Sequence, residues 1–181
     1  RAHPFLNIEN ALLILKYSSI YGIAAVGAAV VIISGGIDLA PRSIIPLASV
    51  ICGVLFVDAS WPLGAAMTAA LMVGLAAGIL SSILIVIVGL PPFIATLGIM
   101  GITRGAAFII TEGRYFDLSS KLVGGWRPLG LPADWVPPLV MIGLALVFQV
   151  LMTRFQWGRA VFSVGGNETA ALFSGIAVGR V

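Results

Sequence analysis

The chain is a succession of long apolar runs separated by short breaks that are polar or contain Gly and Pro. A helix of about 20 apolar residues is long enough to cross the hydrocarbon core of a bilayer. Four of the runs are long, and one, 44–57, is short. We therefore expect membrane spans at roughly 11–33, 40–57, 63–88, 93–111 and 136–153.

The breaks contain residues that end one helix and start the next. Gly35-Gly36 stops the first run, and Pro41 lies three residues after Asp38, an order that suits a new helix capped by this carboxylate. Because 44–57 is short for a span, it must take residues from the Asp38 end, tilt or be discontinuous. Pro91-Pro92 cannot donate backbone hydrogen bonds, so we expect one helix to end and another to begin there.

Composition supports this assignment, because 60% of the residues are hydrophobic and only 9% are charged. Soluble domains are about a quarter charged. The predicted fold class is an all-α membrane protein, a polytopic bundle of transmembrane helices in a single domain, 1–181. The chain opens on Arg1 and stops at Val181 without a closing helix, so we expect it to be part of a longer protein.

Few residues offer catalytic or metal-binding chemistry. The net charge of +3 is small and its basic residues are scattered, so no nucleic-acid partner is expected. With one Cys (Cys52) and one His (His3), we expect no metal site and no cofactor. An intramembrane aspartyl protease needs two neighbouring carboxylates, and Asp38 is the one acidic residue that falls among the apolar runs. An enzyme is therefore not expected.

The polar tail after the last apolar run, 154–181, contains two Gly-containing motifs. Gly158-Arg159-Ala160 predicts a turn, and Gly165-Gly166 predicts a break before a short helix. Asn167 suits the cap of that helix, Glu168 its positive N-terminal end and Gly175 its stop. Such a helix can transmit a push from a partner to the bundle, but an ordinary interhelical loop fits the same residues.

Three blocks occur together in this chain: Gly35-Gly36-Ile37-Asp38-Leu39, Pro91 to Gly98, and the tail. In this order and spacing they resemble the permease subunits of bacterial ABC importers for sugars. These are the ribose/xylose/autoinducer-2 type, within the branched-chain-amino-acid/monosaccharide permease superfamily. The resemblance covers the chain from Phe5 to Val181. It departs at Ala40-Pro41-Arg42, where the family more often has a small polar residue, an aliphatic residue and Gly.

The resemblance implies an ATP-driven importer that moves a small polar solute, a monosaccharide, by alternating access. It implies a multi-pass protein of the bacterial inner membrane, with 112–135 extracytoplasmic and 154–181 forming a cytoplasmic coupling loop with a short helix. The implied partners are an ATP-binding cassette subunit, a second permease subunit, an extracytoplasmic solute-binding protein and membrane lipid. The chain has no Gly-x-x-x-x-Gly-Lys-Ser/Thr loop of its own, so ATP hydrolysis is expected in the partner. The residues implied in contact with the ATPase are Arg159, Gly165, Gly166, Asn167, Glu168, Ala170 and Ala171.

A second set of residues is a candidate for the translocation pathway or its gate: Gly35, Gly36, Asp38, Pro92, Phe93, Thr96 and Arg104. The alternative interpretation of Asp38 is a structural one, a helix cap that pairs with Arg42. An Arg in mid-membrane costs about 2.5–3.5 kcal/mol and usually finds a partner, so Arg104 also fits a structural ion pair. Lys16 and the Trp residues of 112–135 suit anchors at the membrane interface. The alternative function is an ion-coupled secondary transporter or channel, which would use Asp38 and Arg104 and need no ATPase.

Overall fold

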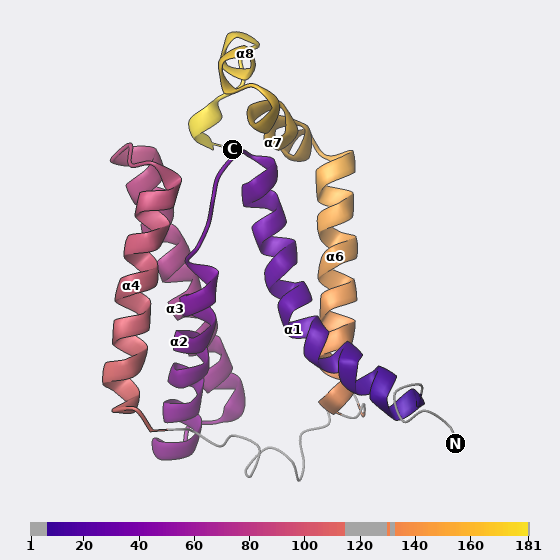
Figure 1. Ribbon diagram of the computed structural model, residues 1–181, viewed down its shortest axis with the longest axis vertical. Helices are drawn as coiled ribbons and strands as arrows, with labels where there is room; N and C mark the ends of the chain where they lie inside the picture. Colours follow the sequence, from indigo (N-terminus) through magenta and orange to yellow (C-terminus); the bar gives the residue numbers. More distant parts are fainter. Residues whose placement is uncertain (1–6, 115–129, 131–132, 181) are drawn as a thin grey trace. The chain divides into compact units, whose positions relative to one another are not determined.

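The computed structural model describes residues 7–114, 130 and 133–180. Over this part of the chain the protein is helical and has no strand, which confirms the expected all-α class (Figure 1). The α-helices are α1 (Ile8–Ile33), α2 (Pro41–Gly53), α3 (Leu63–Ser82), α4 (Pro92–Thr111), α6 (Val136–Arg154), α7 (Gln156–Gly166) and α8 (Glu168–Phe173). Single π-helical segments extend two of them, η2 (Val54–Asp58) after α2 and η3 (Ile83–Ile87) after α3. Short 3-10 helices lie at η5 (Ala133–Trp135) and η6 (Val178–Arg180).

Five helices in the described ranges are long and apolar enough to cross a membrane: Ile8–Ile33, Pro41–Asp58, Leu63–Ile87, Pro92–Thr111 and Val136–Arg154. Many large apolar side chains lie exposed along them, such as Tyr21 at 78% and Ile109 at 74%. Lipid, unlike water, solvates such surfaces without cost. The protein is therefore a multi-pass membrane protein.

The short second run reaches membrane-spanning length by beginning early. Its helix starts at Pro41 and continues through the π-helical segment to Asp58, 18 residues in all. At 1.5 Å per residue this is about 27 Å, close to the thickness of the hydrocarbon core. The run takes residues from the Asp38 end, which is one of the three expected solutions.

The chain forms two compact units, one built from 1–35 and 126–181 and the other from 36–125. In the second unit α2 and α4 run in the same direction, because Ile37 bonds to Thr96 near the start of α4 and Ser43 bonds to Thr103 further along. The Ser43 and Thr103 hydroxyl oxygens are 2.6 Å apart and both residues are buried. α3 packs against both helices. The buried apolar cluster of this unit consists of Ala40, Ala77 and Ile99, with Ile44 and Leu84 against it.

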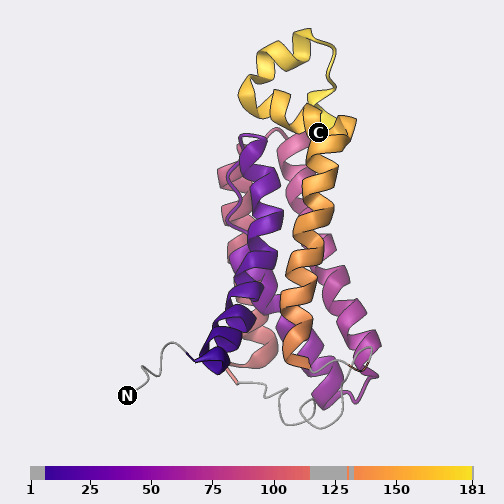
Figure 2. The ribbon, with the colours of Figure 1, turned by 90° about the vertical axis from the view of Figure 1, so that its right-hand side faces the viewer.

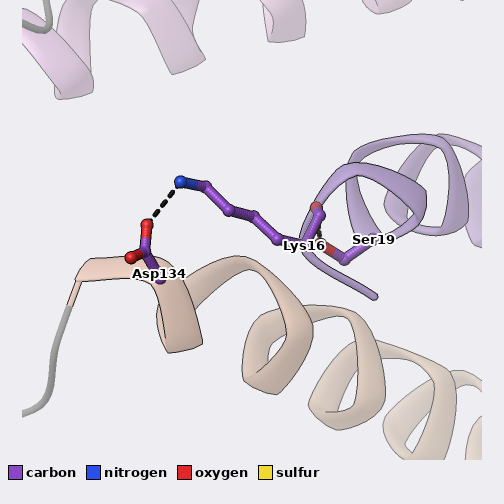
Figure 3. Close-up of polar contacts among 3 residues, drawn as sticks. All are labelled: Lys16, Ser19 and Asp134. Carbon is purple, nitrogen blue, oxygen red and sulfur yellow. Dashed lines mark hydrogen bonds and ion pairs between the residues drawn. The ribbon is translucent and has the colours of Figure 1, made fainter. Parts of the chain in front are cut away.

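In the first unit α1 and α6 pack side by side and also run in the same direction (Figure 2). Gly22 of α1 lies directly against the Met141 side chain of α6, a close approach that a residue without a side chain permits. Nearer the start of both helices, the Lys16 ammonium pairs with the Asp134 carboxylate (Figure 3). The Ser19 hydroxyl donates to the Lys16 carbonyl oxygen at 2.6 Å. Both side chains of this ion pair stay partly exposed, so we expect it to orient the helices more than stabilise them.

The Ser43–Thr103 contact predicts energetic coupling between α2 and α4. In a double-mutant cycle of Ser43→Ala and Thr103→Val, we expect a coupling of about 0.6 kcal/mol and at most about 1.7 kcal/mol, the range for interhelical hydrogen bonds in membranes. The measurement is unfolding of the purified intact protein in detergent. Thr68→Val is the control, because the exposed Thr68 hydroxyl donates to the Gly64 carbonyl within its own helix. Additive effects of Ser43→Ala and Thr103→Val, like those of Ser43→Ala with Thr68→Val, would contradict the coupling.

Candidate functional site

The tail forms two helices joined by one extended residue. α8 begins after Asn167, whose side-chain oxygen accepts a hydrogen bond from the Ala170 N–H at 2.9 Å. Glu168 lies in its first turn, where a negative charge complements the positive end of the helix. α8 ends at Phe173, and Gly175 follows with a φ of 82°, a conformation that glycine adopts readily. The predicted cap, first turn and stop of this helix are confirmed.

The turn predicted at Gly158-Arg159-Ala160 is wrong, because these residues belong to α7. The chain bends earlier, at Phe155, the one extended residue between α6 and α7. Gly158 is buried against the backbone of Met152, and a Cβ atom there would overlap that backbone. The glycine therefore permits a tight corner between two helices and does not form the turn itself.

The other end of α7 meets the end of α1. A Cβ atom on Gly165 would overlap the Ile33 carbonyl group, lying 2.8 Å from its carbon, and would be 3.2 Å from the Ser34 Cα atom. Gly35, with a φ of 88°, also lies beside Gly165. α7 is thus held at both ends by backbone contacts, on α6 through Gly158 and on α1 through Gly165.

The residues predicted to contact the ATPase are exposed, with the exception of Ala171. Arg159 is exposed on α7, Gly165 and Gly166 form its last turn, and Glu168 and Ala170 are exposed on α8. Ala171 is buried at 3% exposure, so its side chain packs within the chain.

In the second unit the first two sequence blocks come together. The Thr96 hydroxyl donates to the Ile37 carbonyl at 3.3 Å and to the Phe93 carbonyl at 3.3 Å, so it ties the irregular 36–40 segment to the first turn of α4. Pro92 occupies the first position of α4, which agrees with a plain helix start. Phe93 is half-exposed.

The pairing of Asp38 with Arg42 is not found. The Asp38 carboxylate accepts a hydrogen bond from the Ala40 N–H at 2.9 Å, and the residue at the cap position of α2 is Ala40. A short side chain bonds readily to the backbone two residues on, which competes with a longer reach to Arg42. Arg104 is also without the structural ion pair considered for it, because the one salt bridge among the described residues joins Lys16 and Asp134. No group of His, Cys, Asp or Glu suited to a metal occurs within 7–114, 130 and 133–180.

Comparison with known proteins identifies the family of this chain. The sequence profile described as "Branched-chain amino acid transport system / permease component" matches residues 10–181. The chain belongs to this permease family. It is 32% identical over 177 residues to the D-allose transport system permease protein AlsC of Escherichia coli (strain K12), covering 96% of the chain and 53% of that protein. It is 34% identical over 182 residues to the ribose import permease protein RbsC of Bacillus subtilis (strain 168), covering 98% of the chain and 55% of that protein.

A third relative is the autoinducer 2 import system permease protein LsrD of Yersinia enterocolitica serotype O:8 / biotype 1B (strain NCTC 13174 / 8081). It is 34% identical over 169 residues, covering 88% of the chain and 50% of that protein. The chain thus spans about half the length of the curated relatives it matches. No solved structure matches it.

The structure of this permease-family chain also draws attention to two residues that the sequence pattern did not single out. Leu172 and Phe173, in the last turn of α8, are 60% and 86% exposed. The sequence signal by which they could have been found is a pair of large apolar side chains at the end of a short polar segment. Exposed apolar side chains of this kind mark interaction surfaces.

The contact of Gly165 with α1 predicts that two adjacent glycines tolerate a side chain very differently. Gly165→Ala should destabilise the intact protein by about 1–3 kcal/mol, as overpacking does, because the new methyl group overlaps the Ile33 carbonyl. Gly166→Ala is the matched control, since a Cβ atom there has nothing within 4 Å. Thermal unfolding in detergent measures both. Equal effects of the two substitutions would contradict the contact.

Proposed function

We propose that this chain is the transmembrane permease subunit of an ATP-driven importer, which moves a monosaccharide across the bacterial inner membrane by alternating access. The main support is the similarity along nearly the whole chain to permeases named for D-allose, ribose and autoinducer 2. The partners are an ATP-binding cassette subunit, a second permease subunit and an extracytoplasmic solute-binding protein. Most of the segment 112–135, proposed to face that binding protein, lies outside the described residues.

The proposed ATPase contact is the exposed surface of α8, with Glu168 in the first turn and Phe173 in the last. Phe173 offers an apolar anchor for a pocket on the partner, and Glu168 offers a charge beside it. Large apolar side chains that fill a pocket dominate the energy of many interfaces. In this proposal Arg159 and Ala170 contribute to the rim.

A displacement of α8 reaches the membrane helices through α7. The corner at Gly158 passes it to α6, and the contact at Gly165 passes it to α1. Close-packed backbones transmit displacement because they have no free space to absorb it. Nucleotide-driven movement of the ATPase would thus shift the ends of two spanning helices together, as alternating access requires.

The proposal predicts a nucleotide-sensitive contact at α8. Cysteines placed by Glu168→Cys or Phe173→Cys in the intact protein, with Cys52→Ala, should form crosslinks with cysteines on a co-expressed ATPase subunit, and ATP should change the yield. Ile109→Cys is the control, because Ile109 is equally exposed but lies near the end of α4 that leads into 112–135.

If neither α8 cysteine crosslinks while solute uptake is intact, α8 is not the coupling element. The alternative, an ion-coupled transporter or channel, would then be favoured if uptake also continued without any ATPase.

A further inference from the structure

Two arginines line one cavity of the second unit. The cavity has a volume of about 330 Å³ and lies between α2 and α4. Arg42 is the second residue of α2 and Arg104 lies in the second half of α4. The lining consists of Arg42, Ser43, Pro46, Met100, Arg104 and Ala107.

The register of the two helices fixes these arginines next to each other. Ser43 and Thr103, whose hydroxyl oxygens are 2.6 Å apart, are the immediate chain neighbours of Arg42 and Arg104. The Ser43 hydroxyl also lies 3.0 Å from the Ala40 carbonyl oxygen and the Thr103 hydroxyl 2.7 Å from the Ile99 carbonyl oxygen, so one hydroxyl donates across the helices while the other donates to its nearby carbonyl. Arg42 and Arg104 therefore lie at adjacent positions on the two helices and line one cavity, and both residues are exposed.

The cavity lies partway along α4, a helix long enough to cross the membrane. Ile37 bonds to Thr96 in the first turns of α4, and Ser43 near the start of α2 bonds to Thr103, so α2 begins only partway along α4 (Figure 1). The non-helical segment 36–40 thus runs beside a spanning helix. Arg104 lies within that helix, where cations are costly and usually have a partner.

No acidic side chain of the second unit, within its described residues, pairs with either arginine. These acidic residues are Asp38, Asp58 and Glu112. Asp38 bonds the Ala40 N–H, while Asp58 ends η2 and Glu112 follows the last residue of α4. The two arginines thus line one cavity without a counter-charge from these residues, although like charges repel each other.

We propose that the Arg42–Arg104 cavity binds an oxyanion, either a carboxylate or a phosphate group. A guanidinium presents its N–H groups as a planar fork that matches the two oxygens of such a group. One oxyanion between two forks reduces the repulsion between the two positive charges, and its planar pair of oxygens suits arginine better than lysine at both positions. The group belongs either to a soluble anion that enters the pathway or to the headgroup of an acidic lipid, and the two sources are separable by experiment.

The test uses the purified intact protein in nanodiscs and does not depend on ATPase coupling. Thermal unfolding is followed in phosphatidylcholine discs with sodium phosphate or sodium acetate against sodium chloride of equal ionic strength. It is also followed in discs that contain phosphatidylglycerol. A ligand that binds the folded state raises the unfolding temperature in a concentration-dependent way. The variants are Arg42→Gln, Arg104→Gln and Arg104→Lys, with Arg154→Gln as the control because Arg154, at the end of α6, does not line this cavity.

If the anion is soluble, phosphate or acetate stabilises the wild type, and its apparent affinity falls about tenfold or more in either Gln variant, as loss of a charged hydrogen bond implies. If it is a lipid headgroup, only phosphatidylglycerol stabilises, and the Gln variants lose that response. Arg154→Gln responds as wild type in both cases. Arg104→Lys keeps a charge but loses the fork, so we expect an intermediate response even if a Gln variant does not fold.

Two results would overturn the proposal. One is a wild type that responds to neither the soluble anions nor phosphatidylglycerol, which indicates that a carboxylate from outside the described residues fills the cavity. The other is an Arg42→Gln or Arg104→Gln protein that responds as strongly as Arg154→Gln. Neither result bears on the crosslinking of α8.

Discussion

The close approach of two backbones, at Gly165 of α7 and Ile33 of α1, is the constraint on which the tail depends. A side chain at position 165 has no room, so the end of α1 and the end of α7 can lie in direct contact because residue 165 is a glycine. Gly158 does the same against Met152 at the other end of α7. Small residues allow helices in membranes to pack at such short range. Here they fix α7 against the ends of two spanning helices, α6 and α1.

The second unit depends instead on hydrogen bonds made by side-chain hydroxyl groups. Thr96 holds the irregular segment through Ile37, and Ser43 with Thr103 sets the register of α2 against α4. Because apolar packing alone provides little driving force between helices in lipid, these bonds and close contacts specify the pairing. They also place the start of α2 partway along α4, which brings two arginines to one cavity.

Much of the helical layout could be predicted from sequence, since run length, Gly35-Gly36 and Pro91-Pro92 are local signals. Asn167 was recognisable as a cap for the same reason. The errors came from contacts that depend on distant residues. Gly158 looks like a turn residue unless the Met152 backbone against it is known, and nothing in the pattern links Lys16 to Asp134. Asp38 seemed suited to Arg42, but a backbone N–H two residues away satisfies its carboxylate first.

In the proposed importer, α7 and the end of α1 move as one body when the partner ATPase acts. Spin labels at Ile32 of α1 and Ser163 of α7, both exposed, allow their separation to be measured by pulsed electron resonance in the proposed assembly. We expect the same distance distribution without nucleotide and with ATP trapped, while the distance from Ser163 to a label on the proposed second permease subunit changes. A separation between Ile32 and Ser163 that shifts with nucleotide would show that α7 and the end of α1 move independently.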